Sequence, residues 1–118
     1  MDWASYKRLC DQPNYWSRWM LEESKQLFDA AGANDIAQQL ADALGKPPLP
    51  LPDGHNGSPL AQMFVLDMPS GQRARAADLM AHLVARKVRT ARTAERGLGG
   101  FAEAWQEFAA RRGEDTDV

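Results

Sequence analysis

The chain has 118 residues, of which 44% are apolar and 25% charged, and its formal net charge is −2. This composition is that of an ordinary folded domain with one modest core, so it excludes disorder along the whole chain. The slightly acidic balance disfavours a general nucleic-acid coat protein, which would be basic throughout.

The single cysteine, Cys10, excludes an intramolecular disulfide and any cysteine-based metal site. The first residues lack the basic and apolar stretches of a secretory signal. No apolar run approaches the ~20 residues that span a bilayer. We therefore expect a soluble cytoplasmic protein with no membrane partner.

Turn-forming residues divide the first half of the chain into helical segments. A helix is predicted to begin at Asp11-Gln12-Pro13, because proline suits the first turn of a helix. It would end at Gly32, which fits a left-handed cap. A second helix is predicted over Asp35 to Leu44, with Asn34 as its cap and Gly45 after it.

Residues 46–57 do not fit this helical pattern. Four prolines fall within residues 46–52, and residues 53–57 have the composition of turns. Prolines favour the polyproline II conformation, at ~3.1 Å per residue. The sequence therefore predicts a stiff, extended proline-rich strap that lies across the helices and buries Leu49 and Leu51.

A short apolar segment follows the strap, from Ser58-Pro59, a cap followed by a proline, to Met68. By composition, Met63 to Leu66 could be a buried strand or part of a helix. We favour a helix, because the sequence offers no convincing second strand for it to pair with. Pro69 ends the segment.

The most unusual segment is a long basic helix predicted from Ser70 to Gly97, which holds seven basic and two acidic side chains. On a helix, one face is apolar and includes Ala76, Met80 and Leu83. The opposite face gathers Arg75, His82, Arg86, Arg89, Arg92 and Arg96. Glycines interrupt the chain after it, and a last helix is predicted over residues 101–112.

These segments predict an all-α fold, a compact irregular bundle of four to six helices tied together by the strap at about residues 46–57. We expect a single helical domain over residues 1–112. The acidic residues 113–118 are expected to form a disordered tail.

The basic face suggests a function, because guanidinium groups bind carboxylates and phosphates bidentately. Our leading hypothesis is a non-enzymatic interaction or regulatory module that docks an acidic protein surface through this face. The alternative is a helical protein that binds nucleic acid through the same face. The same charges could instead pair with carboxylates of this chain, or of a second copy in a homo-oligomer.

Two aromatic side chains, Tyr15 and Trp19, lie at the boundary of the apolar face of the first predicted helix. Tyrosine and tryptophan are enriched at interaction hot spots, so these residues are candidates for a second partner contact. Core packing is the commoner role of such residues.

A small enzyme is the third hypothesis. Asp78 and His82 are spaced i, i+4, so the carboxylate could orient the histidine as a general base. No recognisable nucleophile accompanies them, and His55 with Asp53 are too few ligands for a metal. We therefore predict no catalytic residue, metal or cofactor.

Overall fold

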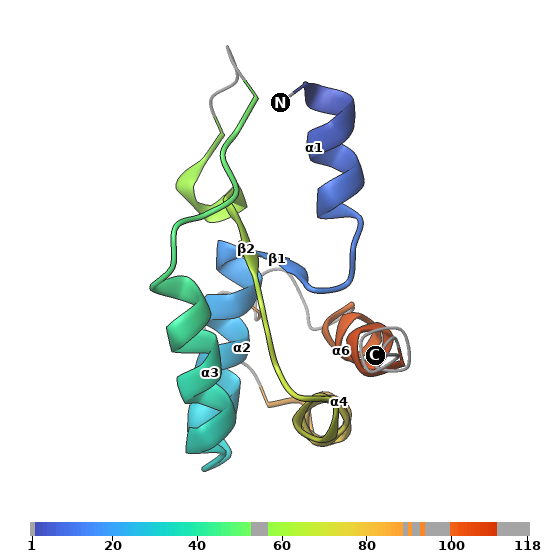
Figure 1. Ribbon diagram of the computed structural model, residues 1–118. Coiled ribbons are helices and arrows are strands. Elements are labelled where there is room, and N and C mark those ends of the chain that lie inside the picture. Colours follow the sequence, from blue (N-terminus) through green and yellow to red (C-terminus); the bar gives the residue numbers. More distant parts are fainter. Residues whose placement is uncertain (1, 53–56, 89, 91–92, 94–99, 111–118) are drawn as a thin grey trace.

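The computed structural model describes residues 2–52, 57–88, 90, 93 and 100–110 (Figure 1). Most of these residues are helical, as expected, and two short strands accompany the helices. In chain order the elements are α1 (Trp3–Cys10), β1 (Tyr15–Ser17), α2 (Arg18–Ala30), α3 (Asn34–Leu44), the single 3₁₀ turn η1 (Pro59–Ala61), β2 (Met63–Val65), α4 (Ser70–Ala85) and α6 (Phe101–Ala110).

Four of the described helices pack in two pairs, α2 with α3 and α4 with α6, while α1 contacts β1. Strand β2 runs from the strap toward α4 and passes between the α2–α3 pair and α6 (Figure 1). No helix among the described residues combines the length and apolar character needed to cross a bilayer.

The mainly helical character of the fold agrees with our all-α prediction, but the two-stranded sheet was not predicted. Strands β1 and β2 are antiparallel, with Trp16 opposite Phe64. Side chains alternate along a strand, so this pair faces the core, whereas the neighbouring Val65 is 40% exposed. We had interpreted Met63 to Leu66 as helical for want of a partner strand. The partner is β1, which lies within residues predicted to be helical.

The N-terminal region also differs from the prediction. Residues 11–14 form a turn, and helix α2 begins only at Arg18. Helix α1 was not predicted. Its start has a sequence signal, because the Asp2 carboxylate accepts a hydrogen bond from the Ser5 backbone N–H at 2.7 Å, as an N-cap does.

Other predicted boundaries are confirmed. Gly32 follows α2 with a φ of +80°, the left-handed conformation that glycine adopts without steric cost. Helix α3 spans Asn34–Leu44, one residue longer than predicted. The Ser58 hydroxyl accepts from the Leu60 N–H at 3.3 Å, but this cap opens one turn of 3₁₀ helix and not a longer helix.

The described part of the strap, residues 46–52 and 57, contains no helix and lies beside β2. The Leu49 N–H donates to the Met63 carbonyl at 2.7 Å. Leu49 and Leu51 are half-buried, so the strap covers less apolar surface than expected. Prolines carry no N–H and cannot extend this pairing, so the strap protects the edge of β2 without forming a third strand.

The long basic helix is shorter than predicted, because α4 ends at Ala85. The Lys87 N–H donates to the Val84 carbonyl and the Val88 N–H to the Leu83 carbonyl, each at 3.0 Å. This pair of bonds, with Lys87 at a φ of +57°, is the Schellman motif that closes many helices. The predicted end at Gly97, residues 111–112 of the last predicted helix, and the tail 113–118 lie outside the described residues.

Trp105 of α6 joins the layers of the core and is 0% exposed. Its ring centroid lies 4.5 Å from that of Trp16 in β1, 5.3 Å from that of Phe28 in α2 and 5.7 Å from that of Phe108. The indole N–H donates to the Ser24 hydroxyl at 3.3 Å. One side chain therefore holds α6 against both the sheet and α2.

We predict that Trp105→Ala lowers the free energy of unfolding by about 3–5 kcal/mol, because it leaves a large cavity among packed rings. That is a large share of the ~5–15 kcal/mol typical of a domain. Ser24→Ala removes only the hydroxyl acceptor and should cost about 1–3 kcal/mol. Urea denaturation followed by circular dichroism measures both losses. A Trp105→Ala loss no greater than that of Ser24→Ala would contradict the role assigned to the ring.

Candidate functional site

The first residue of the predicted basic face, Arg75, is paired within the chain. Its guanidinium makes two hydrogen bonds to the Asp35 carboxylate, at 2.5 and 3.0 Å. Asp35 lies in the first turn of α3, where a negative charge is also favourable to the helix. Arg75 therefore links α4 to α3, and the N–H groups that it donates to Asp35 are already engaged within the chain.

This ion pair alters the titration of both groups. The hydrogen bond from Arg75 is the main reason that the pKa of Asp35 lies below its ordinary value. The same hydrogen bond raises the pKa of Arg75 further above its ordinary value. Both side chains are about half exposed, so the pair links the two helices at the surface and not in the core.

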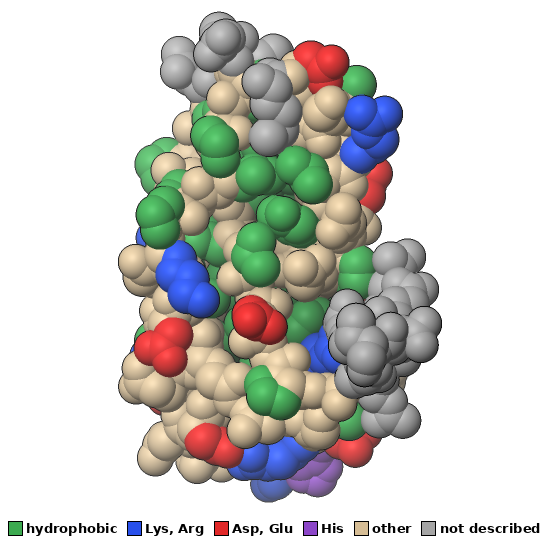
Figure 2. Space-filling view, viewed as in Figure 1, with side chains coloured by type: hydrophobic (Ala, Val, Ile, Leu, Met, Phe, Trp, Pro, Cys, Tyr) green, Lys and Arg blue, Asp and Glu red, His purple; other side chains and the backbone are tan. Residues whose placement is uncertain are grey.

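The end of α4 carries a second group of basic side chains, which we call the cationic end: His82, Arg86 and Lys87. All three are exposed. An Arg86 guanidinium nitrogen (Nη1) lies 3.5 Å from His82 Nε2. Within the described residues, none of the three forms an ion pair. Figure 2 shows Lys and Arg side chains beside a histidine at the lower end of the molecule, where Figure 1 places α4.

Lys87 occupies an unusual backbone position in this group. Among the described residues it is the one residue other than glycine with a positive φ, +57°. A side chain in the left-handed region costs roughly 1 kcal/mol, and helices that end in this way usually have glycine there. The chain therefore has a lysine at a position where glycine is expected to carry less backbone strain.

Beyond the cationic end, Thr90 is hydrogen-bonded to a buried carboxylate of α2. The Thr90 hydroxyl donates to Glu23 Oε1 at 2.7 Å, and Glu23 is buried in α2. Thr90 and the buried Thr93 also exchange bonds, with the Thr90 N–H donating to Thr93 Oγ1 at 2.7 Å and the Thr93 N–H to Thr90 Oγ1 at 3.3 Å. These contacts fix where the chain goes once it leaves α4.

The remaining predicted arginines, Arg89, Arg92 and Arg96, lie outside the described residues. Helix α4 ends at Ala85, before the first of these three arginines. Of the predicted face, the structure thus brings together His82 and Arg86, adds Lys87, and assigns Arg75 to an internal pair.

The two aromatic candidates are both partly buried. Trp19 packs edge-to-face on Phe101, with ring centroids 5.6 Å apart. Tyr15 lies in β1 and lines a cavity of about 270 Å³ together with Cys10. Burial is the main reason that the pKa of the Cys10 thiol is raised, which disfavours the reactive thiolate. A partner contact through Tyr15 or Trp19 stays a prediction.

The predicted pair Asp78 and His82 is exposed on α4. The His82 ring contacts the Arg86 guanidinium at 3.5 Å and makes no described hydrogen bond to Asp78. Among the described residues, no three histidine, cysteine, aspartate or glutamate side chains come together as metal ligands. This arrangement gives no support to a general base at His82.

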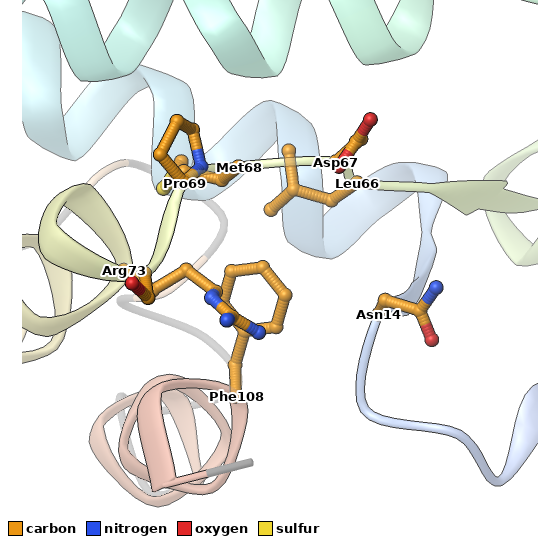
Figure 3. Close-up of a pocket in the computed structure, with 8 residues that line it drawn as sticks. Asn14, Leu66, Asp67, Met68, Pro69, Arg73 and Phe108 are labelled. Carbon is orange, nitrogen blue, oxygen red and sulfur yellow. The ribbon is translucent and has the colours of Figure 1, made fainter. Parts of the chain in front are cut away.

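A second feature lies at the opposite end of α4, where a cavity of about 330 Å³ opens beside the first turn (Figure 3). We call it the α4 cavity. The segment between β2 and α4 forms one wall through Leu66 and Met68. Phe108 of α6 and Asn14, which precedes β1, lie across from this wall.

Arg73 is the charged group of the α4 cavity, and it is only 3% exposed. Its guanidinium lies 5.2 Å from the centroid of the Phe108 ring, in the geometry of a cation–π contact. Figure 3 shows the guanidinium beside the Phe108 ring, with Asn14 farther away. The buried Arg73 side chain therefore forms part of the cavity wall, together with the exposed Asp67.

Sequence reasoning had counted Arg73 among the basic residues of the long helix but had not selected it. A signal was present, because Arg73 precedes Ala76 by three residues and Ala77 by four. It therefore shares the buried stripe of α4, which consists of Arg73, Ala76, Ala77, Met80 and Leu83. An arginine on the apolar stripe of a helix is unusual, and such residues are usually paired when buried.

Comparison with known proteins identifies no relative. No protein-family profile matches the chain, and neither a curated protein nor a solved structure is significantly similar to it. The function must therefore be argued from the geometry alone.

We predict that Lys87→Gly raises the free energy of unfolding by about 0.5–1 kcal/mol, because glycine adopts the positive φ without strain. Arg86→Gly is the matched control. Arg86 has a φ of −87°, so glycine relieves no strain there and should destabilise the protein. Thermal denaturation of the two variants and the wild type tests this. A loss of stability in Lys87→Gly would contradict the strain argument.

We predict that the contribution of the Arg75–Asp35 pair depends on pH. The folded-state pKa of Asp35 is depressed, so the stabilisation is present above the unfolded-state pKa, about 3.9, and is lost as pH falls through the folded-state value. The stability difference between wild type and Asp35→Asn should therefore shrink between pH 6 and about pH 2. Urea denaturation at several pH values measures it. A difference that is constant over this range would show that the ion pair is not its cause.

Proposed function

We propose that this chain is a non-enzymatic interaction module that binds an acidic surface of a partner protein through the cationic end of α4. The supporting observation is that His82, Arg86 and Lys87 are exposed together without an ion pair among the described residues. Arg86 and Lys87 are both positively charged, so an acidic partner surface would attract them.

The helix macrodipole offers a competing explanation, since basic side chains near a helix C-terminus are stabilising by roughly 0.3–1 kcal/mol. Any basic residue in the last turn would interact favourably with the dipole. The dipole does not account for Lys87 at a positive φ, because the conformational cost of that backbone position is about as large as the stabilisation from the dipole. A lysine retained at a strained position is better explained by a requirement for its charge.

A protein partner fits these side chains better than nucleic acid does. Nonspecific binding to nucleic acid depends on several phosphate contacts at once, and each contact adds to the salt dependence. The described residues supply two cations at the cationic end, Arg86 and Lys87, while Arg75 and Arg73 are engaged elsewhere. A compact acidic patch with two or three carboxylates matches this arrangement.

The test is a pull-down from a lysate of the source cells, with the wild type compared with the double variant Arg86→Glu/Lys87→Glu. We expect at least a tenfold loss in recovery of a specific partner, because two attractions become repulsions. Lys7→Glu/Arg8→Glu is the matched control. It changes the net charge by the same amount on exposed residues of α1 and should leave recovery unchanged.

Circular dichroism must first show that both double variants fold. If the two variants lose the same partners equally, the effect is one of overall charge and the proposed surface is wrong. Binding of random duplex DNA that weakens steeply with salt, and that the Arg86→Glu/Lys87→Glu variant abolishes, would instead favour nucleic acid as the partner.

A further inference from the structure

We propose that the cationic end is a proton-coupled surface, which binds its acidic partner more tightly when His82 becomes protonated. This inference rests on the proposed function, because it concerns the same surface and the same class of partner. Histidine is the side chain that ordinarily changes its charge between about pH 5 and 8. The attraction between this surface and an acidic protein therefore depends on pH within the physiological range.

The contact between His82 and Arg86 depends on the charge of the histidine ring. Arg86 Nη1 lies 3.5 Å from His82 Nε2, and the two residues are about one helical turn apart. A guanidinium has N–H donors and no acceptor, so the ring nitrogen that faces it must act as the acceptor. A histidine ring has an acceptor nitrogen only while it is neutral. The observed contact therefore favours the uncharged ring.

Protonation of His82 changes the surface in two ways. The ring can no longer accept a hydrogen bond from Arg86, so those guanidinium N–H groups are left for another acceptor. The ring also gains a positive charge close to the charges of Arg86 and Lys87, and like charges repel one another. Carboxylates of an acidic partner compensate this repulsion. Protonation and binding therefore favour each other.

The other charges along α4 do not cancel this change. Asp78 lies one turn before His82 and makes no described hydrogen bond to it. Arg75 lies two turns before His82 and is bonded to Asp35 of α3. These groups carry the same charge whether or not the ring is protonated. They alter the overall attraction for a partner, but protonation still adds one positive charge to the surface.

The charges of the neighbouring helices are also distinct from His82. Helix α6 packs with α4, whose buried stripe excludes the exposed His82. Within the described residues, neither Glu103 nor Glu107 of α6 forms an ion pair with His82. The buried Glu23 of α2 accepts a hydrogen bond from Thr90. A partner's carboxylates therefore meet an exposed ring that has no described ion pair.

The direction of the pH dependence follows from these charges. The carboxylates of a partner ordinarily titrate near pH 4, so they stay ionised above about pH 5. A histidine gains its proton as the pH falls through its range. The affinity for an acidic partner should therefore rise between about pH 7.5 and 5.5. One exposed ion pair corresponds to a gain of about two- to fivefold in affinity.

The test uses an octa-aspartate peptide as the acidic probe, titrated into the full chain by calorimetry at low ionic strength. We expect the Kd of the wild type to fall about two- to fivefold between about pH 7.5 and 5.5. His82→Gln keeps a polar side chain without a titrating charge and should show no such gain. His55→Gln changes the other histidine of the chain and is the matched control, which should keep the gain.

A second readout follows the proton itself. Near about pH 6.5 the wild type should take up part of a proton on binding, so the measured enthalpy should differ between buffers of different ionisation heat. His82→Gln should lack this uptake. His82→Lys carries its charge throughout the range, so it should also lack the uptake and should bind at the higher pH as tightly as the wild type binds at the lower pH. A role in packing alone would not produce this pattern.

The outcomes separate this inference from the proposed function. If Arg86→Glu/Lys87→Glu abolishes binding of the peptide but His82→Gln keeps the pH dependence of the wild type, proton coupling is wrong and the acidic-partner proposal stands. If the peptide does not bind at either pH, or binds the Arg86→Glu/Lys87→Glu variant equally well, the surface does not recognise carboxylates. That result overturns both the inference and the proposed function.

Discussion

The packing of Trp105 is the interaction on which the rest of the structure depends. The ring is fully buried and touches Trp16 from β1, Phe28 from α2 and Phe108 from its own helix. A small domain has few large side chains with which to fill its core, so one indole that contacts three elements contributes much of the apolar burial. Its N–H, bonded to Ser24, fixes the orientation of the ring. The position of α6, and with it Phe108 under Arg73, follows from this contact.

Helix α4 links this core to the α4 cavity and to the cationic end. Its apolar stripe packs with α6, its first turn borders the α4 cavity and its last turn carries the cationic end. The two sites use positive charge differently. At the cavity the Arg73 guanidinium is buried and lies 5.2 Å from the centroid of the Phe108 ring. At the cationic end the side chains are exposed, so their electrostatic interactions are weaker and more sensitive to salt.

The basic residues illustrate why a count of charges overstates a binding surface. Arg18 donates twice to the Gln62 side chain and lies 4.8 Å from the centroid of the Phe64 ring, so it braces the sheet. Arg75 is paired with Asp35, and Arg73 is buried. Each of these contacts joins segments far apart in the sequence. Spacing along a helix identifies which side chains share a face, but it contains no information about what lies opposite that face.

The sequence by itself determined the features that depend on local chemistry. The left-handed Gly32, the helix α3, the Ser58 cap and the buried positions Ala76, Met80 and Leu83 follow from glycine, proline and the helical period. Tertiary structure decided the features that need a distant partner. Met63–Val65 became a strand because β1 was there to pair with it, and the contacts of Arg73 and Arg75 were set by α6 and α3. Local propensities differ by a few tenths of a kcal/mol per residue, so pairing and burial override them wherever a short segment can adopt either form.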